Sequence, residues 1–126
     1  MVDDKLLVRM KYGVWNRWRE DNPGAPVDLD GARLDGMVLT GMNLSGASLR
    51  GASLHATNLM NADLRGADFT SANLAEADLI GANLEGAILR GAVLREADLL
   101  GARLANAQYS AEDLTGAFHV PDTGNP

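Results

Sequence analysis

The chain has 126 residues, a formal net charge of −6 and no cysteine. Without cysteine there are no disulfides, thiolate metal sites or cysteine nucleophiles. No run approaches the roughly 20 apolar residues of a membrane span, and residues 1–4 lack the basic character of a signal peptide. We therefore expect one domain, located in the cytoplasm and not bound to a membrane.

Residues 3–21 are expected to form one helix that begins at Asp3 or Asp4. Its apolar positions fall on one stripe with two further residues beside it, namely Leu7, Met10, Val14 and Trp18 with Leu6 and Trp15. Gly13 weakens this helix, and the segment 22–26, which contains two prolines, ends it.

From Leu29 to Leu114 a large apolar residue recurs at every fifth position, through 18 repeats. Alanine stands two positions before this centre in 13 repeats, and glycine two positions after it in 11. Five residues turn an α-helix by about 500°, and in a strand two residues five apart point to opposite faces. Neither element therefore places these side chains on one side. The period instead indicates a solenoid whose backbone turns a corner once per repeat, at the glycine.

The repeats resemble the consensus A(D/N)LXX of the pentapeptide repeat family, most directly in residues 62–66, 67–71, 72–76 and 82–86. The resemblance implies an all-β solenoid, a right-handed quadrilateral β-helix with four repeats per coil and about four and a half coils. The segment 76–81 returns as the similar segment 96–101, 20 residues later, which agrees with four repeats per coil. We expect a capping helix and linker in residues 1–26, the β-helix in 27–117 and a tail in 118–126.

Trp15 and Trp18 have two interpretations: a recognition motif, or a cap over the first coil. The cap is favoured because a solenoid end exposes apolar core and unpaired backbone. Similar leaders precede the repeats in bacterial members of the family. At the other end, Glu112 takes an inward position, so the regular coil is expected to end near Tyr109. Phe118 and Val120 follow without a second amphipathic helix, which leaves Tyr109, Phe118 and Val120 as candidate end contacts.

Four repeats per coil bring two sets of residues together on the third face. Met60, Ile80 and Leu100 follow the centres and form an outward apolar column, a candidate interaction surface. Beside it lies an acidic corner formed by Glu76, Asp78, Glu96 and Asp98. We interpret this corner as a solvated edge relieved in part by Arg95, with cation binding or acid/base chemistry as the alternative.

The sequence predicts a non-enzymatic protein without a cofactor. His55 and His119 lie far apart in the chain, and the glycines occupy corners instead of a phosphate-binding loop. The repeat region carries six basic against twelve acidic residues, which disfavours DNA or RNA as a partner. The predicted function is a rigid protein-interaction module that binds another protein or a second copy.

Two alternatives stay open. The resemblance includes acidic quinolone-resistance dimers that mimic duplex DNA and bind gyrase, although this chain is short, lacks a visible loop insertion, and places Arg50, Arg65, Arg90 and Arg95 among its acids. The other alternative is a cation-binding protein that uses the acidic corner.

Overall fold

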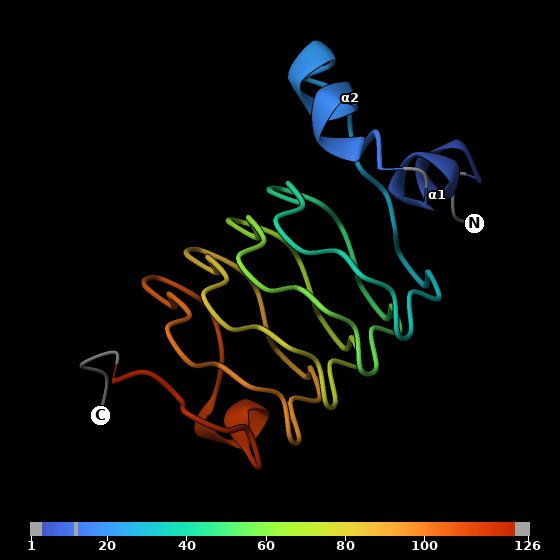
Figure 1. The fold of residues 1–126 in the computed structure, drawn as a ribbon. Helices are drawn as coiled ribbons and strands as arrows, with labels where there is room; N and C mark the ends of the chain where they lie inside the picture. Colours follow the sequence, from blue (N-terminus) through green and yellow to red (C-terminus); the bar gives the residue numbers. More distant parts are fainter. Residues whose placement is uncertain (1–3, 12, 123–126) are drawn as a thin grey trace.

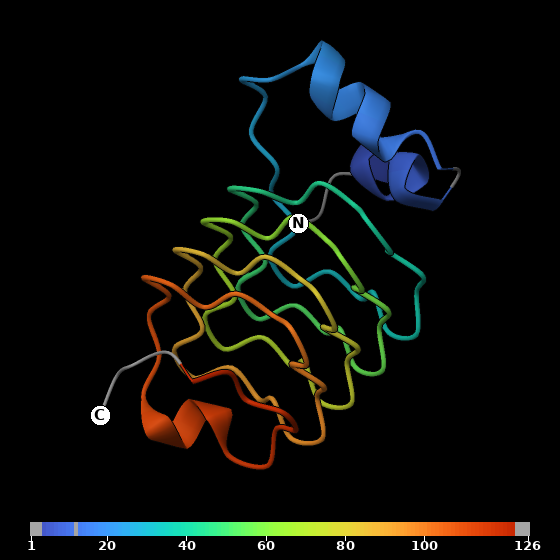
Figure 2. The ribbon, with the colours of Figure 1, turned by 60° about the vertical axis from the view of Figure 1, so that its left-hand side comes forward.

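The structure is a computed structural model that describes residues 4–11 and 13–122. The described chain begins with two short helices, α1 (Asp4–Lys11) and α2 (Trp15–Asp21), continues as a stack of coils, and includes a 3-10 helix, η1 (Ala111–Leu114), near its C-terminal end (Figure 1). The helices lie at one end of the stack and the C-terminal segment lies at the other (Figure 2).

The prediction of a single helix over residues 3–21 is wrong. The chain breaks between α1 and α2 at Gly13, whose φ of +73° lies in the left-handed region that ends helices. As a result Val14 leaves the predicted stripe and is 51% exposed, whereas Met10 and Trp15 are buried. Asp3, one of the two candidate capping residues, lies outside the described residues.

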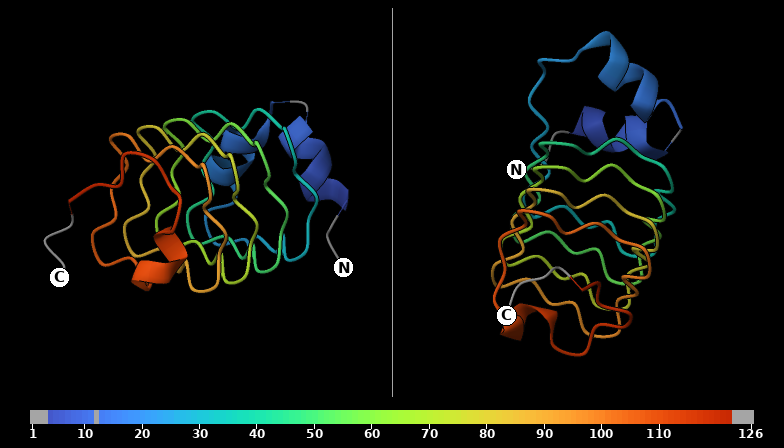
Figure 3. Two further views of the ribbon diagram at one scale, coloured as in Figure 1. Left: turned by 90° about the horizontal axis from the view of Figure 1, so that it is seen from below. Right: turned by 90° about the vertical axis from the view of Figure 1, so that its left-hand side faces the viewer.

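The coils are held together by parallel bridges between residues 20 apart, from Asp28 and Ser48 at one end to Ile88 and Gln108 further along. The Leu29 amide donates to the Ser48 carbonyl at 2.8 Å, and the Ser48 amide donates to the Val27 carbonyl at 2.9 Å. This pattern repeats from coil to coil around one axis (Figure 3). The fold is the right-handed quadrilateral β-helix that the resemblance implied, with an N-terminal helical cap.

Each coil has four sides, which we call walls. Wall 1 is centred on Leu29, wall 2 on Leu34, wall 3 on Leu39 and wall 4 on Leu44, and each wall continues at every twentieth residue. Wall 1 therefore lies opposite wall 3, and wall 2 opposite wall 4.

The interior is filled by the repeat centres and by the alanines two positions before them. The centres from Leu29 to Leu104, including Phe69, are 0–3% exposed. Val27 and Met42 are buried near the helices where alanine is missing, and Met37 there is half-buried. Thr57, the other exception, is also buried, and its hydroxyl donates to the Leu34 carbonyl at 2.9 Å. The core is thus a continuous column of leucine and alanine.

In nine repeats the aspartate or asparagine directly before the centre holds the turn that follows. The Asn83 Oδ1 accepts the Glu85 amide at 3.1 Å, and eight other aspartates and asparagines accept the amide two residues on in the same way. Ser53 has neither a carboxylate nor an amide side chain, and there the Asp35 carboxylate of the preceding coil accepts the His55 amide at 2.9 Å. The consensus D/N therefore satisfies an amide that the ladder leaves unpaired.

The regular coil ends at Tyr109, as the inward position of Glu112 predicted. Residues 111–114 form η1 instead of another repeat, and Glu112 is exposed. The chain then rejoins the ladder, because the Glu96 amide donates to the Gly116 carbonyl at 2.8 Å and the Phe118 amide donates to the Ala97 carbonyl at 2.8 Å.

Candidate interaction surfaces

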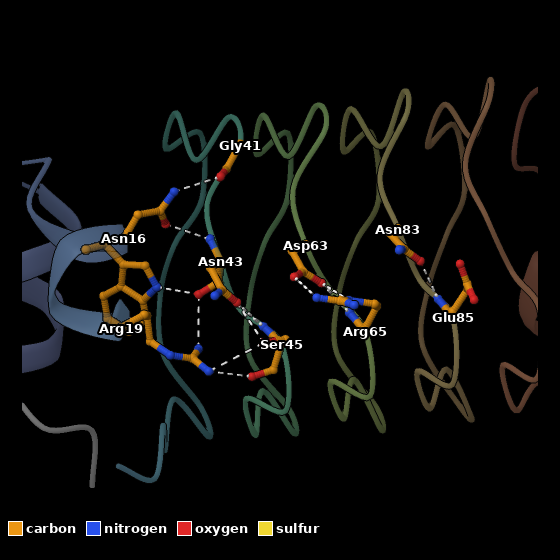
Figure 4. A network of polar contacts seen from close by, with 10 residues as sticks. Asn16, Arg19, Gly41, Asn43, Ser45, Asp63, Arg65, Asn83 and Glu85 are labelled. Carbon is orange, nitrogen blue, oxygen red and sulfur yellow. Dashed lines mark hydrogen bonds and ion pairs between the residues drawn. The ribbon is translucent and has the colours of Figure 1, made fainter. Parts of the chain in front are cut away.

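Side chains of α2 form hydrogen bonds with the backbone groups of wall 4 that face the helical end of the stack (Figure 4). The Asn43 carbonyl accepts the Trp15 Nε1–H at 2.6 Å and the Arg19 Nη1–H at 3.0 Å. The Asn43 amide donates to the Asn16 Oδ1 at 2.8 Å, and Arg19 Nη2 donates to the Ser45 carbonyl at 2.8 Å. In every later coil these backbone groups pair with the coil before, so three side chains replace a missing coil here.

Trp18 packs behind this network instead of joining it. It is half-buried, its ring centroid lies 5.4 Å from that of Trp15, and the Arg9 guanidinium lies 4.7 Å above its ring. Trp15 itself is 1% exposed. Both tryptophans are therefore engaged with the solenoid end and its helices.

The column Met60, Ile80 and Leu100 lies on wall 3. The Asn61 amide donates to the Ile80 carbonyl and the Gly81 amide donates to the Leu100 carbonyl, each at 2.9 Å, so the three residues stack one per coil. Met60 and Ile80 are half-buried, and Leu100 is 51% exposed. The accessible apolar surface of this column is therefore concentrated toward its C-terminal end.

The candidate end contacts separate into two places. Tyr109 is half-buried and packs against the core on wall 1. Phe118 instead bridges Asp98 on wall 3 and is 51% exposed, and Val120, two residues on, is 42% exposed. Phe118 therefore continues the column of Asp98 on wall 3, next to the column of Leu100.

The acidic corner is joined by two histidines. The His55 Nε2 lies 2.5 Å from the Glu76 Oε2, and the His119 Nδ1 lies 2.9 Å from the Asp98 Oδ1. The hydrogen bond from His119 and that from the Leu100 amide lower the pKa of Asp98. Sequence reasoning missed both contacts, although each joins residues 21 apart, which is one coil and one residue.

Asp78 and Glu96 are the other two acidic residues of this corner. Asp78 accepts the Ile80 amide at 3.1 Å, and Glu96 is exposed at a φ of +62°. Among residues 4–11 and 13–122, Arg95 forms no ion pair with these carboxylates. Within the same residues no group of three or more histidine, aspartate or glutamate side chains is arranged as a metal-ligand set.

On wall 4, two carboxylates form ion pairs with arginine. Arg65 donates to both carboxylate oxygens of Asp63 at 2.8 and 2.7 Å, which lowers the pKa of that carboxyl (Figure 4). Arg103 lies 2.6 Å from Glu85 on the neighbouring coil. The carboxylates of wall 3 have no comparable arginine in the described chain.

A hollow of about 270 Å³ lies where the helices meet wall 3. Val38 and Thr40 line it from wall 3, and Met10, Trp15 and Asn16 are among the residues that line it from the helical end. Val38 is 73% exposed, so the helical end of wall 3 also presents an apolar side chain.

Comparison with known proteins gives a consistent result. The family model described as pentapeptide repeats matches residues 28–66, 47–86 and 72–108, with eight copies. A search of curated proteins gives no match. No helix in residues 4–11 and 13–122 has the length and apolar character needed to cross a bilayer.

Two solved structures are similar in sequence as well as fold. A pentapeptide repeat protein from Nostoc PCC 7120 is 35% identical over 81% of this chain and 92% of its own, with a TM-score of 0.64. A pentapeptide repeat protein from the Arabidopsis thaliana thylakoid lumen is 32% identical over 71% of this chain, with a TM-score of 0.64, and this chain spans 59% of its length. A cytoplasmic location for the present chain stays a prediction.

A more distant neighbour is a trypsin-treated form of QnrB1, a plasmid-mediated fluoroquinolone resistance protein. It is 22% identical over 73% of this chain and 55% of its own, with a TM-score of 0.56. At that identity the likeness concerns the fold alone.

Proposed function

Because the chain belongs to the pentapeptide repeat family, we propose that it is a rigid, non-enzymatic module that binds another protein through the side of its rod. The observation that carries this proposal is the apolar surface of wall 3, where Leu100 is 51% exposed next to half-buried Ile80 and Phe118, in the neighbouring column, is also 51% exposed. Stacked apolar groups on one face of a solenoid favour contact with a partner over isolated exposure.

The interior supports a binding role over a catalytic one. Leucine and alanine fill the rod, with centres from Leu29 to Leu104 at most 3% exposed, so the coils enclose a packed core. The turns are fixed by the hydrogen bonds of Asn83 and its equivalents, which gives a wall little freedom to rearrange. A rigid wall loses little conformational entropy when a partner covers it.

The test is recovery of binding proteins from a bacterial lysate on immobilised chain. Ile80→Glu with Leu100→Glu should abolish recovery of proteins that the wild-type chain retains, because a carboxylate on the contact column is costly to bury. Val93→Glu on wall 2 is the matched control, since Val93 is also exposed, at 43%. Circular dichroism must show that both variants keep the fold.

Light scattering on the purified chain identifies a partner that is a second copy. If the wild-type chain has a mass above that of the monomer, and the double variant has a lower mass, wall 3 mediates self-association. Equal recovery on wild-type and double-variant chain contradicts the proposal.

A further inference from the structure

We propose that wall 3 is the docking surface for a basic amphipathic α-helix of a partner protein. The inference rests on the proposed function and specifies the chemistry of the partner. It follows from the charges of the wall, from the position of its apolar residues and from their spacing along the rod.

The first step is the distribution of charge among the walls. All six arginines of residues 27–117 lie on other walls, with Arg50 and Arg90 on wall 1, Arg33 and Arg95 on wall 2, and Arg65 and Arg103 on wall 4. Wall 3 carries Asp78 and Asp98, and Glu76 and Glu96 lie at the corner that leads into it. Among the described residues, the ion pairs of these carboxylates are those of Glu76 with His55 and of Asp98 with His119, so cationic side chains of a partner are the groups that complement the wall.

The second step is that the apolar surface lies on the same wall as these acids. Val38, Leu100 and Phe118 are three of the exposed large apolar residues on wall 3. Leu100 continues the column of Met60 and Ile80, whereas Val38 and Phe118 lie at the two ends of the column of Asp78 and Asp98. The column of Leu100 lies two residues beyond that of Asp98 along the wall, which is about 6.5 Å of extended backbone. A partner must therefore present an apolar row and a cationic row side by side.

The third step is the spacing along the rod. Met60, Ile80 and Leu100 follow one another at the separation of paired strands, about 4.8 Å. An apolar row on an α-helix repeats every 5.4 Å, so its mismatch over two coil steps is only about 1 Å. Side chains on one face of a β-strand repeat about every 6.7 Å, which accumulates a mismatch of about 4 Å. A helix parallel to the rod axis fits the column better than a strand.

A second copy of the chain fits this wall less well. An isologous contact between two copies places the same surface on both sides. Wall 3 carries Asp78, Asp98 and the nearby glutamates but no lysine or arginine of its own repeats, so such a contact brings the carboxylates of both copies close together. Like charges across an interface oppose association.

The experiment measures binding of a fluorescent synthetic peptide to the full chain by anisotropy. The probe is an amphipathic helix of about 15 residues, roughly 22 Å and close to the length of the rod, with a leucine row flanked by lysine. A second peptide replaces every lysine with glutamate, and a third scrambles the order of the first. We expect the lysine peptide alone to bind, with an affinity that decreases as salt is added.

The decisive variant is Asp78→Asn with Asp98→Asn. Asparagine keeps the turn, because Asn58 in the same column accepts the Met60 amide at 3.0 Å. The matched control is Asp28→Asn with Asp68→Asn on the opposite wall, which removes the same charge from two carboxylates that hold equivalent turns. We expect about tenfold weaker binding for the wall 3 variant and less than about twofold for the control.

Leu100→Gln tests the apolar half of the site against Val93→Gln on wall 2, and only the former should weaken binding. Equal loss in both aspartate variants indicates diffuse attraction to an acidic rod and overturns the inference. Equal binding of the lysine and glutamate peptides also overturns it. If no peptide binds but Ile80→Glu with Leu100→Glu still abolishes protein recovery, this inference fails while the proposed function stands.

Discussion

The two ends of the rod are closed in different ways. At the helical end, Trp15, Asn16 and Arg19 present side-chain donors and acceptors to the backbone of residue Asn43, where a preceding coil is missing. At the other end the chain closes its own ladder, because Gly116 pairs with Glu96 through the backbone. The first closure depends on side chains from a separate element, whereas the second depends on the continuation of the coil.

This difference indicates where stability is concentrated. Trp15 is buried and hydrogen-bonded, and with Leu6 and Met10 it belongs to the same apolar cluster as the coils. Tyr109 and Leu114 at the opposite end are only partly buried. We therefore expect the helical end to be the more costly one to lose.

Deleting residues 1–22 should have the largest effect. It uncovers the first coil and leaves the backbone of Asn43 unpaired, so the truncated chain should aggregate or lose cooperative unfolding. Deleting residues 111–126 should leave a cooperative but less stable rod. Thermal unfolding with light scattering measures both. An N-terminally truncated rod that stays soluble and equally stable would favour the recognition interpretation of Trp15 and Trp18.

Single substitutions make the comparison sharper. Trp15→Ala should destabilise the fold by about 3–5 kcal/mol, because a large side chain that is 1% exposed leaves a cavity. Tyr109→Ala should cost less, since that ring is only half-buried. Equilibrium urea unfolding gives both free energies. Equal losses would show that the two ends contribute equally.

A substitution in the middle of the rod provides the reference. Leu79 is fully buried, so Leu79→Ala should cost about 2–5 kcal/mol, while Arg65→Ala on the surface should cost little. Urea unfolding again measures the change. Similar losses for the two variants would contradict the assignment of inward and outward positions.

The smallest expected effect is a difference in pH dependence between the two ends of the rod. The amides of Ser110 and Gly91 donate to the Asp113 carboxylate and lower its pKa. Because the pKa of Asp113 is lower in the folded chain, its carboxylate stabilises the native state at pH values above the unfolded pKa of about 3.9. This contribution is lost as the pH falls through the folded pKa. Amide hydrogen exchange should therefore show the Gly91 amide losing protection in acid before the Asn43 amide, which pairs with the non-titrating Asn16. Asp113→Asn should remove the difference in pH dependence.

The sequence predicts the coils well because their determinants are local and repeated. The period of five places Leu79 and Leu84 inward, and both are fully buried. It also places glycine at the corners, where Gly81 and most others have a φ near +70°. Six residues other than glycine, including Ala56 and Glu76, adopt the same left-handed conformation at corner positions, so the register of the fold overrides local preference there.

Features that depend on distant partners were harder to predict. The hydrogen bond from Trp15 to the Asn43 carbonyl joins residues 28 apart, and the apolar stripe of the leader does not indicate it. The contacts of His55 and His119 with the acidic corner require the coil length to be known first. The turn-holding role of asparagine and aspartate is visible only once the ladder shows which amides lack a partner.

The four-sided coil has a consequence for how such a chain can change its length. An insertion of five residues after Gly81 adds one side and leaves every inward position inward, so the core survives. However, it rotates everything beyond by a quarter turn, and Leu100 and Asp98 move from wall 3 to wall 4. Only insertions of twenty residues keep the column of Ile80 and Leu100 in phase. The fold thus tolerates changes in steps of five, whereas a surface that runs along the rod tolerates them only in steps of twenty.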